Sequence, residues 1–421
     1  MANVEDLIMV IKDQEEKMNA ILHSGDIIKR ELEIPSNSLK TGAAHIITGP
    51  RRSGKSVFAF QLTSGENRGY INFNDERINI DSSELNKVLE AIYRLKGNTD
   101  ILVFDEIQEV QGWERFISRL VDSKKILITG SNARMMSKEL ATYLTGRHLD
   151  YVLLPFSFKE FLSYKGTRIE TNPSTTEKSR IISMLDEYLH IGGFPLAIKN
   201  GSLFLAELYK DIIERDVAQR YHIKLKSKLS ELARYLLVNI SNEISYNKLS
   251  KIIGISGKST VQNWISYMES AYLVFKLERF SFKLKESIMA PKKIYAIDTG
   301  MANTIALRIS KSALIENLVA IELLRRKGYY DKTMEINYWK DYLGREVDFV
   351  IRNKGKVKEL IQVTYASEKA ELKEREIKSL IASSKELKCN NLFIITWDYE
   401  NEIKEGGKKI KLIPLWKWLL Q

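Results

Sequence analysis

The stretch Gly49-Pro50-Arg51-Arg52-Ser53-Gly54-Lys55-Ser56 decides the fold of this 421-residue chain. It matches the pattern G-x-x-x-x-G-K-[ST] at every fixed position. The apolar run 44–48 precedes it, and residues 57–62 can begin a helix after it. A loop between such a strand and helix turns its backbone N–H groups and the helix N-terminus toward a phosphate. The sequence therefore predicts a phosphate-binding loop of the kind that holds ATP.

Different residues of this loop are expected to contact different parts of the nucleotide. Gly49 and Gly54 allow backbone conformations and a close approach that a side chain would block. Lys55 is expected to reach the β- and γ-phosphates, and the Ser56 hydroxyl to ligate Mg²⁺. The other residues expected to line the nucleotide are Pro50, Arg51, Arg52 and Ser53.

An acid pair follows the apolar run 101–104, about fifty residues after the loop. Asp105 is expected to hold Mg²⁺ directly or through water, and Glu106 to polarise the attacking water as general base. Acids often follow strands as helix caps, so the pair alone would be a weak signal. Its spacing from a complete phosphate loop makes it a strong one and favours hydrolysis over passive nucleotide binding.

Polar side chains follow a third apolar run, 126–129. Asn132 is the first candidate for contacting the γ-phosphate or orienting the water, and Ser131 is the second. The alternative is that these residues cap a following helix. Arg147 is a candidate arginine finger, although an ordinary surface arginine fits the pattern nearly as well. Lesser candidates for the finger are Arg134 and Arg115.

Short apolar runs at 44–48, 70–73, 101–104 and 125–129 alternate with helical patterns. This alternation predicts an α/β fold with a doubly wound parallel sheet. From 155 to 222 the pattern is mostly helical, and from 227 to 285 it indicates three helices and a hairpin. After residue 311 a helix, strands and a charged helix are expected.

Composition limits the class of protein. Hydrophobic residues make up 44% of the chain, which is enough for more than one core. The single cysteine, Cys389, excludes an internal disulfide framework and fits a reducing cytoplasm. No leader-like N-terminus and no run of 18 apolar residues is found, so we expect a cytoplasmic protein with no membrane partner. A net charge of +11 permits a nucleic-acid partner without requiring one.

Much of that positive charge lies between residues 222 and 293, which contain 13 Lys and Arg but only 5 Asp and Glu. Residues 246–253, 254–256 and 259–270 fit a helix, a turn and a recognition-like helix, and 271–280 fits a wing. The charge favours contact with a DNA backbone, whereas a winged helix used only for protein contacts is the alternative. The expected DNA-contacting residues are Lys248, Lys251, Lys258, Lys283 and Lys285.

With these motifs the chain resembles the prokaryotic AAA+ ATPases, common in archaea, that couple an AAA+ module to a winged helix and a PD-(D/E)XK nuclease-like domain. The resemblance covers about residues 38–400. It is carried by the phosphate loop and by the stretches 101–109, 129–132, 144–147, 154–161, 192–195 and 346–351.

The resemblance implies an order of domains and three further roles. Asn132 would act as a nucleotide sensor, Arg147 as a finger reaching a neighbouring subunit of a homo-oligomer, and Pro195 as a lid residue near the nucleotide. The expected domains are an N-terminal helix and linker (1–37), an AAA+ core (38–160), a helical lid (161–226), a winged helix (227–300) and a nuclease-like domain (311–421).

A nuclease of this type needs an acid on one strand and an acid-x-Lys on the next, to hold Mg²⁺ and activate water. Asp348 supplies the first acid, with Glu316 or Glu346 in support. On the second strand Gln362 replaces the acid and Thr364 replaces the lysine. A migrated lysine, Lys340 or Lys369, could compensate. Without a cation beside the transition state we expect a degenerate or weak nuclease.

The leading function is therefore an AAA+ ATPase that hydrolyses ATP with Mg²⁺ and acts on DNA, in recombination, repair or mobile-element maintenance. One alternative is a signalling or scaffold NTPase whose winged helix contacts proteins. Another is an ATP-dependent nuclease.

Overall fold

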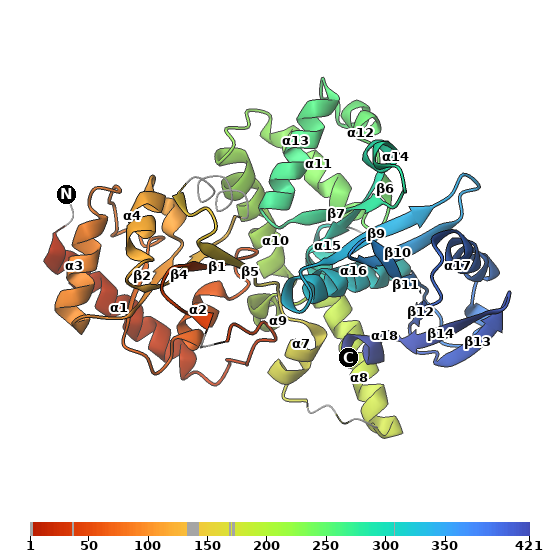
Figure 1. The fold of residues 1–421 in the computed structure, drawn as a ribbon, viewed down its shortest axis with the longest axis horizontal. Helices are drawn as coiled ribbons and strands as arrows, with labels where there is room; N and C mark the ends of the chain where they lie inside the picture. The colour runs from red at the N-terminus through yellow and green to blue at the C-terminus, as the bar shows by residue number, and fades with distance from the viewer. Residues whose placement is uncertain (1–2, 36–37, 133–142, 168–169, 171–172, 307) are drawn as a thin grey trace. The chain divides into compact units, whose positions relative to one another are not determined.

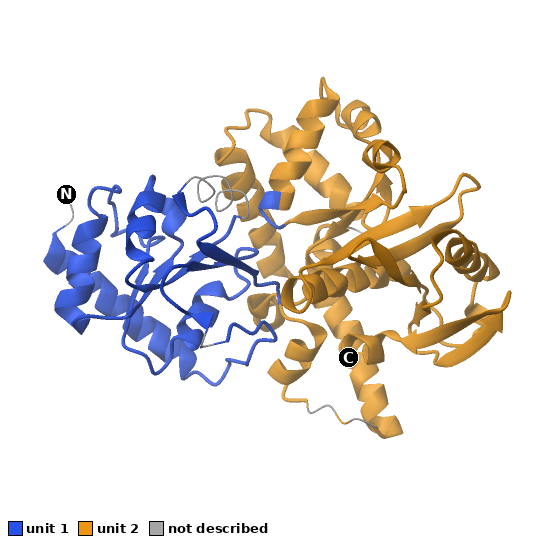
Figure 2. Ribbon diagram, in the orientation of Figure 1, with its two compact units in different colours: residues 1–155, 270–272 blue, residues 156–269, 273–421 orange. Residues whose placement is uncertain are grey.

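The computed structural model describes the whole chain except residues 1–2, 36–37, 133–142, 168–169, 171–172 and 307. It forms two compact units, coloured separately in Figure 2. The first unit contains residues 1–155 and 270–272, and the second contains 156–269 and 273–421.

The first unit is built on a five-stranded sheet with the order β2-β3-β4-β1-β5. All neighbouring strands are parallel, which confirms the predicted parallel α/β sheet. Strands β1 and β3 are buried along their whole length, as their continuous apolar runs predict. The strands are β1 (Ala44–Thr48), β2 (Arg68–Asn72), β3 (Ile101–Asp105), β4 (Lys125–Gly130) and β5 (His148–Val152).

Strand β5 was not predicted. It lies at the edge of the sheet, where it pairs only with β1. Its sequence, His-Leu-Asp-Tyr-Val, has no continuous apolar run because no residue of the strand is fully buried. An edge strand with one solvent-exposed side lacks the continuous apolar run that identified the other four strands of this sheet.

Helices surround this sheet, as Figure 1 shows. Helix α1 packs against α2, α3 and β2, and its N-cap Asn3 accepts a hydrogen bond from the Glu5 N–H. The helices of the first unit are α1 (Val4–Leu22), α2 (Lys55–Leu62), α3 (Leu85–Lys96) and α4 (Trp113–Leu120), with a short 3₁₀ turn η2 (Ile107–Glu109).

The second unit begins with helices, as expected for 155–222. Capping boxes start two of them, with Ser157 paired to Glu160 and Ser174 paired to Glu177. The π-helical segment η3 follows α10 without a break. These elements are α7 (Phe158–Tyr164), α8 (Thr175–Ile191), α9 (Pro195–Asn200), α10 (Ser202–Asp211), η3 (Ile212–Gln219), α11 (Lys226–Val238), α12 (Tyr246–Ile253) and α13 (Lys258–Ser270).

A nine-stranded mixed sheet follows, in the order β13-β14-β12-β11-β10-β9-β7-β8-β6. Strand β7 pairs in parallel with β9, so strands from 227–300 and from 311–421 share one sheet. The sheet thus joins two ranges expected to be separate domains. Its strands are β6 (Glu243–Ile244), β7 (Val274–Arg279), β8 (Lys292–Ala296), β9 (Met334–Lys340), β10 (Glu346–Asn353), β11 (Lys356–Val363), β12 (Leu392–Thr396), β13 (Asn401–Glu405) and β14 (Lys408–Pro414).

The remaining helices pack around this sheet (Figure 1), with α16 against β8, β9 and β11 and α17 against β10 and β11. Across the described residues, no helix is both long and apolar enough to cross a bilayer. The helices are α14 (Leu284–Met289), α15 (Thr299–Ile305), α16 (Lys311–Tyr329), α17 (Glu374–Leu387) and α18 (Leu415–Leu419), with a 3₁₀ turn η4 (Lys369–Glu371).

Candidate active site

The parallel sheet of the first unit brings the predicted site residues to one edge. Thr48 at the end of β1 is level with Gly130 at the end of β4, and Asn72 of β2 is level with Asp105 of β3. Because parallel strands all end on the same side, the residues after β1, β3 and β4 meet there. The phosphate loop follows β1, Asp105 and Glu106 end β3, and Ser131 and Asn132 follow β4.

Two glycines shape the loop. Gly49 has φ of 148°, and a Cβ there would lie 2.3 Å from the Leu153 carbonyl oxygen. Gly54 has φ of 93° and caps α2 without any side-chain hydrogen bond to the helix end. The first N–H groups of α2 are therefore not capped by a side chain, as an anion site at a helix N-terminus requires.

Asp105 is fully buried and surrounded by neutral hydrogen-bond donors. Ser56 Oγ donates to Oδ1 at 3.0 Å, and the Thr129 hydroxyl donates to the same oxygen. Tyr70 Oη and Asn72 Nδ2 donate to Oδ2 at 2.9 and 2.7 Å. Burial and the neighbouring Glu106 raise the pKa of Asp105, and these donors oppose the rise. Among the described residues, this desolvated carboxylate is hydrogen-bonded by hydroxyl and amide groups and not by an ammonium or guanidinium group.

Lys55 and Glu106 lie close to each other beside this acid. Lys55 Nζ donates to the carbonyl oxygens of Gly49 and Pro50 at 3.2 and 2.9 Å, and lies 3.9 Å from Glu106 Oε1. Glu106 has φ of 54°, in the left-handed region that non-glycine residues rarely adopt. Such strained conformations concentrate at functional sites. The Glu106 carboxylate is held by Gln108 Nε2 at 2.5 Å.

The residues present fit ATP with Mg²⁺. The Asp105 carboxylate and the Ser56 hydroxyl are hydrogen-bonded neighbours, and both are the hard oxygen ligands that Mg²⁺ prefers. The Ser53 hydroxyl, inside the loop, is buried and makes no hydrogen bond to any described residue. Lys55 donates to two loop carbonyls and forms a long ion pair with Glu106, and a phosphate bound in the loop would compete for these contacts.

Arg30 supports the loop from behind and was not predicted. It is 6% exposed and donates to the carbonyl oxygens of Ser53 and Leu154 at 3.1 and 2.6 Å. It lies 23 residues before Ser53 and 124 before Leu154, in a segment without any motif. Only the folded chain reveals the contact.

The remaining nucleotide-site predictions stay predictions. Asn132 is buried directly after β4. Arg147 is partly exposed and bonds within its own chain, to Asp122 Oδ1 at 2.9 Å and to Ser118 Oγ at 2.8 Å. Arg115 Nε donates to the Tyr143 hydroxyl. Arg134 lies outside the described residues.

Pro195 lies in the second unit, at the first turn of α9. Close packing explains why the two residues before Phe194 are glycines. A Cβ on Gly193 would lie 2.2 Å from the Phe156 carbonyl oxygen, and one on Gly192 would lie 2.1 Å from Asp298 Oδ1. Asp298 accepts the Gly193 N–H at 2.7 Å and caps α15 through the Met301 N–H at 2.8 Å. Burial raises the pKa of Asp298 to about 6.

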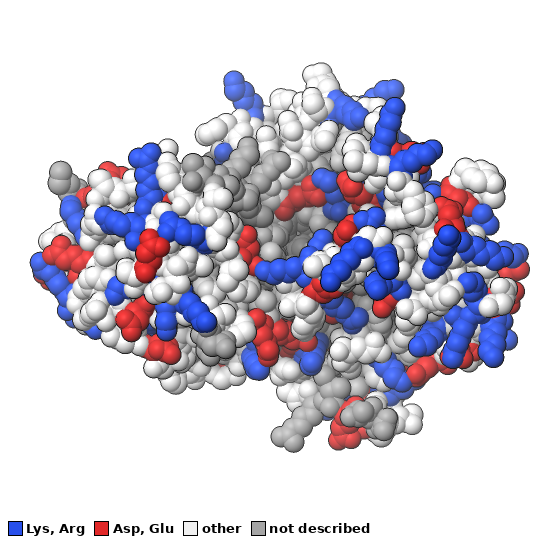
Figure 3. Space-filling model, viewed as in Figure 1, with Lys and Arg blue, Asp and Glu red and all other residues white. Residues whose placement is uncertain are grey.

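The region expected to contact DNA contains the predicted helices. In α13, Val261, Trp264, Ile265 and Met268 are buried, as their spacing predicts. The five expected contact lysines are exposed, whereas Lys292 and Lys293 of the same basic region are buried. Part of the local surplus of positive charge is therefore inside the protein. Figure 3 shows basic and acidic side chains interspersed over the face in view, densest in Lys and Arg near β13 and β14.

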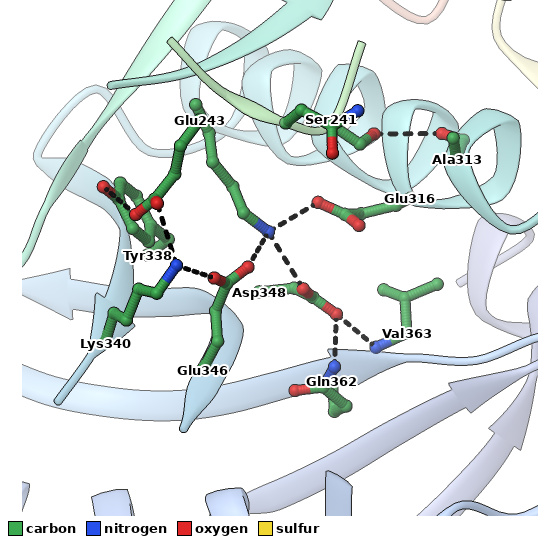
Figure 4. A network of polar contacts seen from close by, with 12 residues as sticks. Ser241, Glu243, Ala313, Glu316, Tyr338, Lys340, Glu346, Asp348, Gln362 and Val363 are labelled. Atoms are coloured by element: carbon green, nitrogen blue, oxygen red, sulfur yellow. Dashed lines mark hydrogen bonds and ion pairs between the residues drawn. The ribbon is translucent and has the colours of Figure 1, made fainter. Parts of the chain in front are cut away.

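The acids of the nuclease-like pattern do meet. Glu316 of α16 and Glu346 and Asp348 of β10 point toward one another in Figure 4. Gln362 Nε2 donates to Asp348 Oδ2 at 2.7 Å. Of the two lysines considered as replacements, Lys340 reaches Glu346 Oε2 at 3.2 Å, and Lys369 lies on the exposed turn η4. A third lysine, Lys293, was missed and lies among the three acids.

Comparison with known proteins agrees with the assignment of a nucleotide-binding domain in the first unit. The chain is 37% identical over 422 residues to the uncharacterized protein MJ1544 of Methanocaldococcus jannaschii, covering 95% of this chain and 92% of that protein. The chain belongs to the family of MJ1544. In this member of the MJ1544 family, residues 41–162 match an AAA domain. Residues 182–313 and 311–418 match two domains of unknown function, DUF8612 and DUF4143.

More distant likenesses extend the comparison. An uncharacterized protein of Haemophilus influenzae is 28% identical over 399 residues, covering 89% of this chain and 94% of that protein. The Thermotoga maritima RuvB Holliday junction branch migration motor is 15% identical, with a TM-score of 0.28 over 63% of this chain and 89% of that chain. The replication initiator DnaA bound to AMPPCP and single-stranded DNA is 16% identical, with a TM-score of 0.24 over 55% of this chain and 83% of that chain. The AAA domain of this member of the MJ1544 family contains the phosphate loop at residues 49–56 and the parallel five-stranded sheet.

Proposed function

We propose that the chain hydrolyses ATP with Mg²⁺ at the edge of the first sheet. The observation that carries the proposal is the buried Asp105, bonded to Ser56 of the loop and followed by the strained Glu106. Lys55 would bind the β- and γ-phosphates, and Ser56 and Asp105 would hold the metal. Mg²⁺, when bound, would neutralise charge on the phosphates. Glu106 would take the proton of the attacking water, and Asn132 would orient the γ-phosphate.

The test compares two glutamates of one short segment. Glu106→Gln should keep nucleotide binding and reduce turnover by about 10²–10⁴-fold, because an amide cannot accept the proton. Glu109→Gln is the matched control, since Glu109 is an exposed carboxylate three residues later. Binding of a fluorescent ATP analogue and phosphate release are measured for both. Equal turnover of the two variants would exclude Glu106 as the base.

We further propose that α11–α13 with β7 and β8 form a winged helix that binds DNA. The support is the set of exposed lysines on α12, α13 and the segment before and in α14. Replacing Lys248, Lys251 and Lys258 with Ala should weaken DNA binding and reduce the log–log salt slope by about 0.9 for each lost phosphate contact.

The control for this experiment replaces three exposed lysines elsewhere in the same unit. Lys404, Lys409 and Lys411 on β13 and β14 carry the same total charge. If both triple variants lose affinity equally, binding is a property of net charge and not of the winged helix. An unchanged slope in the first triple would favour the scaffold function, in which the same surface contacts protein.

Arg147 is proposed to act in trans, in a homo-oligomer with ATP between subunits. Arg147→Ala should bind ATP normally but turn over about 10³-fold more slowly. Asp122→Ala is the matched control, because it removes the ion-pair partner and leaves the guanidinium. If Arg147 only braces its own chain through Asp122 and Ser118, both variants should behave alike. A finger predicts that only Arg147→Ala loses activity, and that mixing it with Lys55→Ala restores part of it.

A further inference from the structure

Three carboxylates of the nine-stranded sheet surround one buried ammonium group. Lys293 Nζ lies 2.9 Å from Glu316 Oε1, 2.6 Å from Glu346 Oε1 and 3.1 Å from Asp348 Oδ1. The Lys293 side chain is 2% exposed. In Figure 4 the dashed lines from the three acids converge on one nitrogen. One oxygen of every acid therefore faces the same cation.

Donors other than Lys293 also contact each of the three acids. The Tyr295 hydroxyl donates to Glu316 Oε1 at 2.8 Å. Gln362 Nε2 and the Val363 N–H donate to Asp348 Oδ2 at 2.7 and 2.9 Å. Lys340, which also binds Glu243 at 2.8 Å, lies 3.2 Å from Glu346 Oε2. Each oxygen that does not face Lys293 on Glu346 and Asp348 thus has its own donor.

A divalent metal does not fit this arrangement. Mg²⁺ requires oxygen ligands at about 2.0–2.1 Å. An ion on the three oxygens that face Lys293 would need the space of the ammonium group, and the two positive charges would repel. Among the residues that the structure describes, no group of three or more His, Cys, Asp or Glu is arranged to hold a metal ion. The Mg²⁺ expected from the nuclease-like pattern therefore has no place in the folded chain.

One further atom beside the acids has the chemistry of a metal ligand. The Gln362 Oε1 atom is buried and accepts no hydrogen bond from the described residues, while its Nε2 is fixed on Asp348. A carbonyl oxygen on the residue that contacts Asp348 supplies the kind of ligand a hard divalent ion prefers. The three carboxylates and the Gln362 carbonyl are groups that could ligate a metal ion, but the carboxylates form ion pairs with Lys293 instead.

We propose that Lys293 is the resident cation of this cluster in place of a divalent metal, and that the cluster fastens β8 to α16 and β10 instead of cleaving phosphodiesters. The lysine comes from the 227–300 range, and the three acids come from the 311–421 range. The ion pairs therefore join the segments that the shared sheet also joins. Removing the ammonium should uncover a latent divalent metal site made of Glu316, Glu346, Asp348 and Gln362.

The experiment measures Mn²⁺ binding by electron paramagnetic resonance in nucleotide-free protein. All proteins carry Ser56→Ala, so that the phosphate loop does not contribute. The parent is expected to bind no Mn²⁺ stoichiometrically, and Lys293→Met is expected to gain one equivalent. Adding Asp348→Asn to Lys293→Met should remove that gain. Lys340→Met is the matched control and should gain nothing, because Lys340 contacts only Glu346 of the three acids.

Three outcomes would overturn the proposal. In the first, the parent binds one equivalent of Mn²⁺ and loses it when Asp348→Asn is added. That result would mean that a metal ion displaces Lys293 from the acids, as a functional nuclease requires. A folded Lys293→Met that binds no Mn²⁺ would mean that the acids do not form a latent site. If Lys293→Met folds poorly, Mn²⁺ should raise its melting temperature and leave that of the parent unchanged. The absence of that difference contradicts the proposal as well.

Discussion

Two buried acid sites, one in each compact unit, hold their negative charge in different ways. Asp105 is surrounded by hydroxyl and amide donors, and the nearby Lys55 bonds to loop carbonyls. Asp348 and its two neighbours close around Lys293. Neutral donors orient a carboxylate without cancelling its charge, whereas an ammonium cancels it. We therefore propose that the first site takes an external cation, whereas the second already contains an internal one.

The pKa values agree with this contrast. Burial alone would lower the pKa of Lys293, but Tyr295 and the three carboxylates outweigh it and raise the pKa well above its usual value. These contacts therefore favour the charged ammonium form of Lys293. At Asp105, burial and Glu106 raise the pKa of an acid that, among the described residues, is hydrogen-bonded only by neutral groups. A cation bound beside this buried carboxylate would favour its charged form.

The largest expected effect comes from the same substitution at both sites. Lys293→Met should lower the free energy of unfolding by about 3–5 kcal/mol, because it leaves buried carboxylates without their partner. Turnover per folded molecule should not change. Lys55→Met should reduce turnover by about 10²–10³-fold, as loss of a group that stabilises developing charge does. Its unfolding free energy should change much less.

Denaturant unfolding and phosphate release measure the two quantities, and Lys340→Met is the control for removing a less buried lysine. If Lys55→Met proves as destabilising as Lys293→Met, the two sites do not differ as described.

Asp298 is a third buried acid, held only by backbone N–H groups, and it should show a pH effect of about 3 kcal/mol. Burial raises its pKa to about 6, against 3.8 for an ordinary aspartate. Between these values the folded chain keeps a proton that the unfolded chain has lost. Stability should therefore fall as pH rises from about 4 to 6, by up to about 3 kcal/mol at 1.36 kcal/mol for each pH unit. The stability of Asp298→Asn should not fall in this way, because asparagine does not titrate.

The comparison requires unfolding curves of both proteins across this pH range. A constant difference between wild type and Asp298→Asn would show that Asp298 does not titrate in that window.

The smallest expected change in unfolding free energy comes from removing one tyrosine hydroxyl at each site. Tyr70 donates to Asp105 at 2.9 Å, and Tyr295 donates to Glu316 at 2.8 Å. Tyr70→Phe should cost about 1.5–3 kcal/mol, the range for hydrogen bonds to charged groups. Tyr295→Phe should cost about 0.5–1.5 kcal/mol, because Lys293 still binds the same oxygen. The reverse order in nucleotide-free protein would contradict the distinction between the two sites.

The first site could be predicted from the sequence because its parts are local. The phosphate loop is one continuous segment, and Asp105 ends a strand that is apolar throughout. The parallel sheet then has to place both at the same edge. Arg30 could not be predicted, because its partners are backbone carbonyls far along the chain.

The second site could be predicted only in part. Its acids stand in a recognisable pattern, but Lys293 lies in the sequence Pro291-Lys292-Lys293, which has the composition of an exposed basic segment. Neighbouring residues of a strand point to opposite faces, so one of two adjacent lysines is expected to be solvated. Both are buried here, and Lys292 bonds to the carbonyl oxygens of Ser287 and Ile288. Only the pairing of β8 within the sheet reveals the acids that compensate Lys293.

The shared nine-stranded sheet limits how this chain can be divided. The two domains of unknown function meet at residues 311–313, as if they were separable pieces. A cut there would separate β7 from β9 and leave both with unpaired edges. It would also remove Lys293 from its acids and Tyr338 from Glu243 and the Pro291 carbonyl. Neither half should be soluble alone, and exchange of one half between distant relatives should succeed only when the other half moves with it.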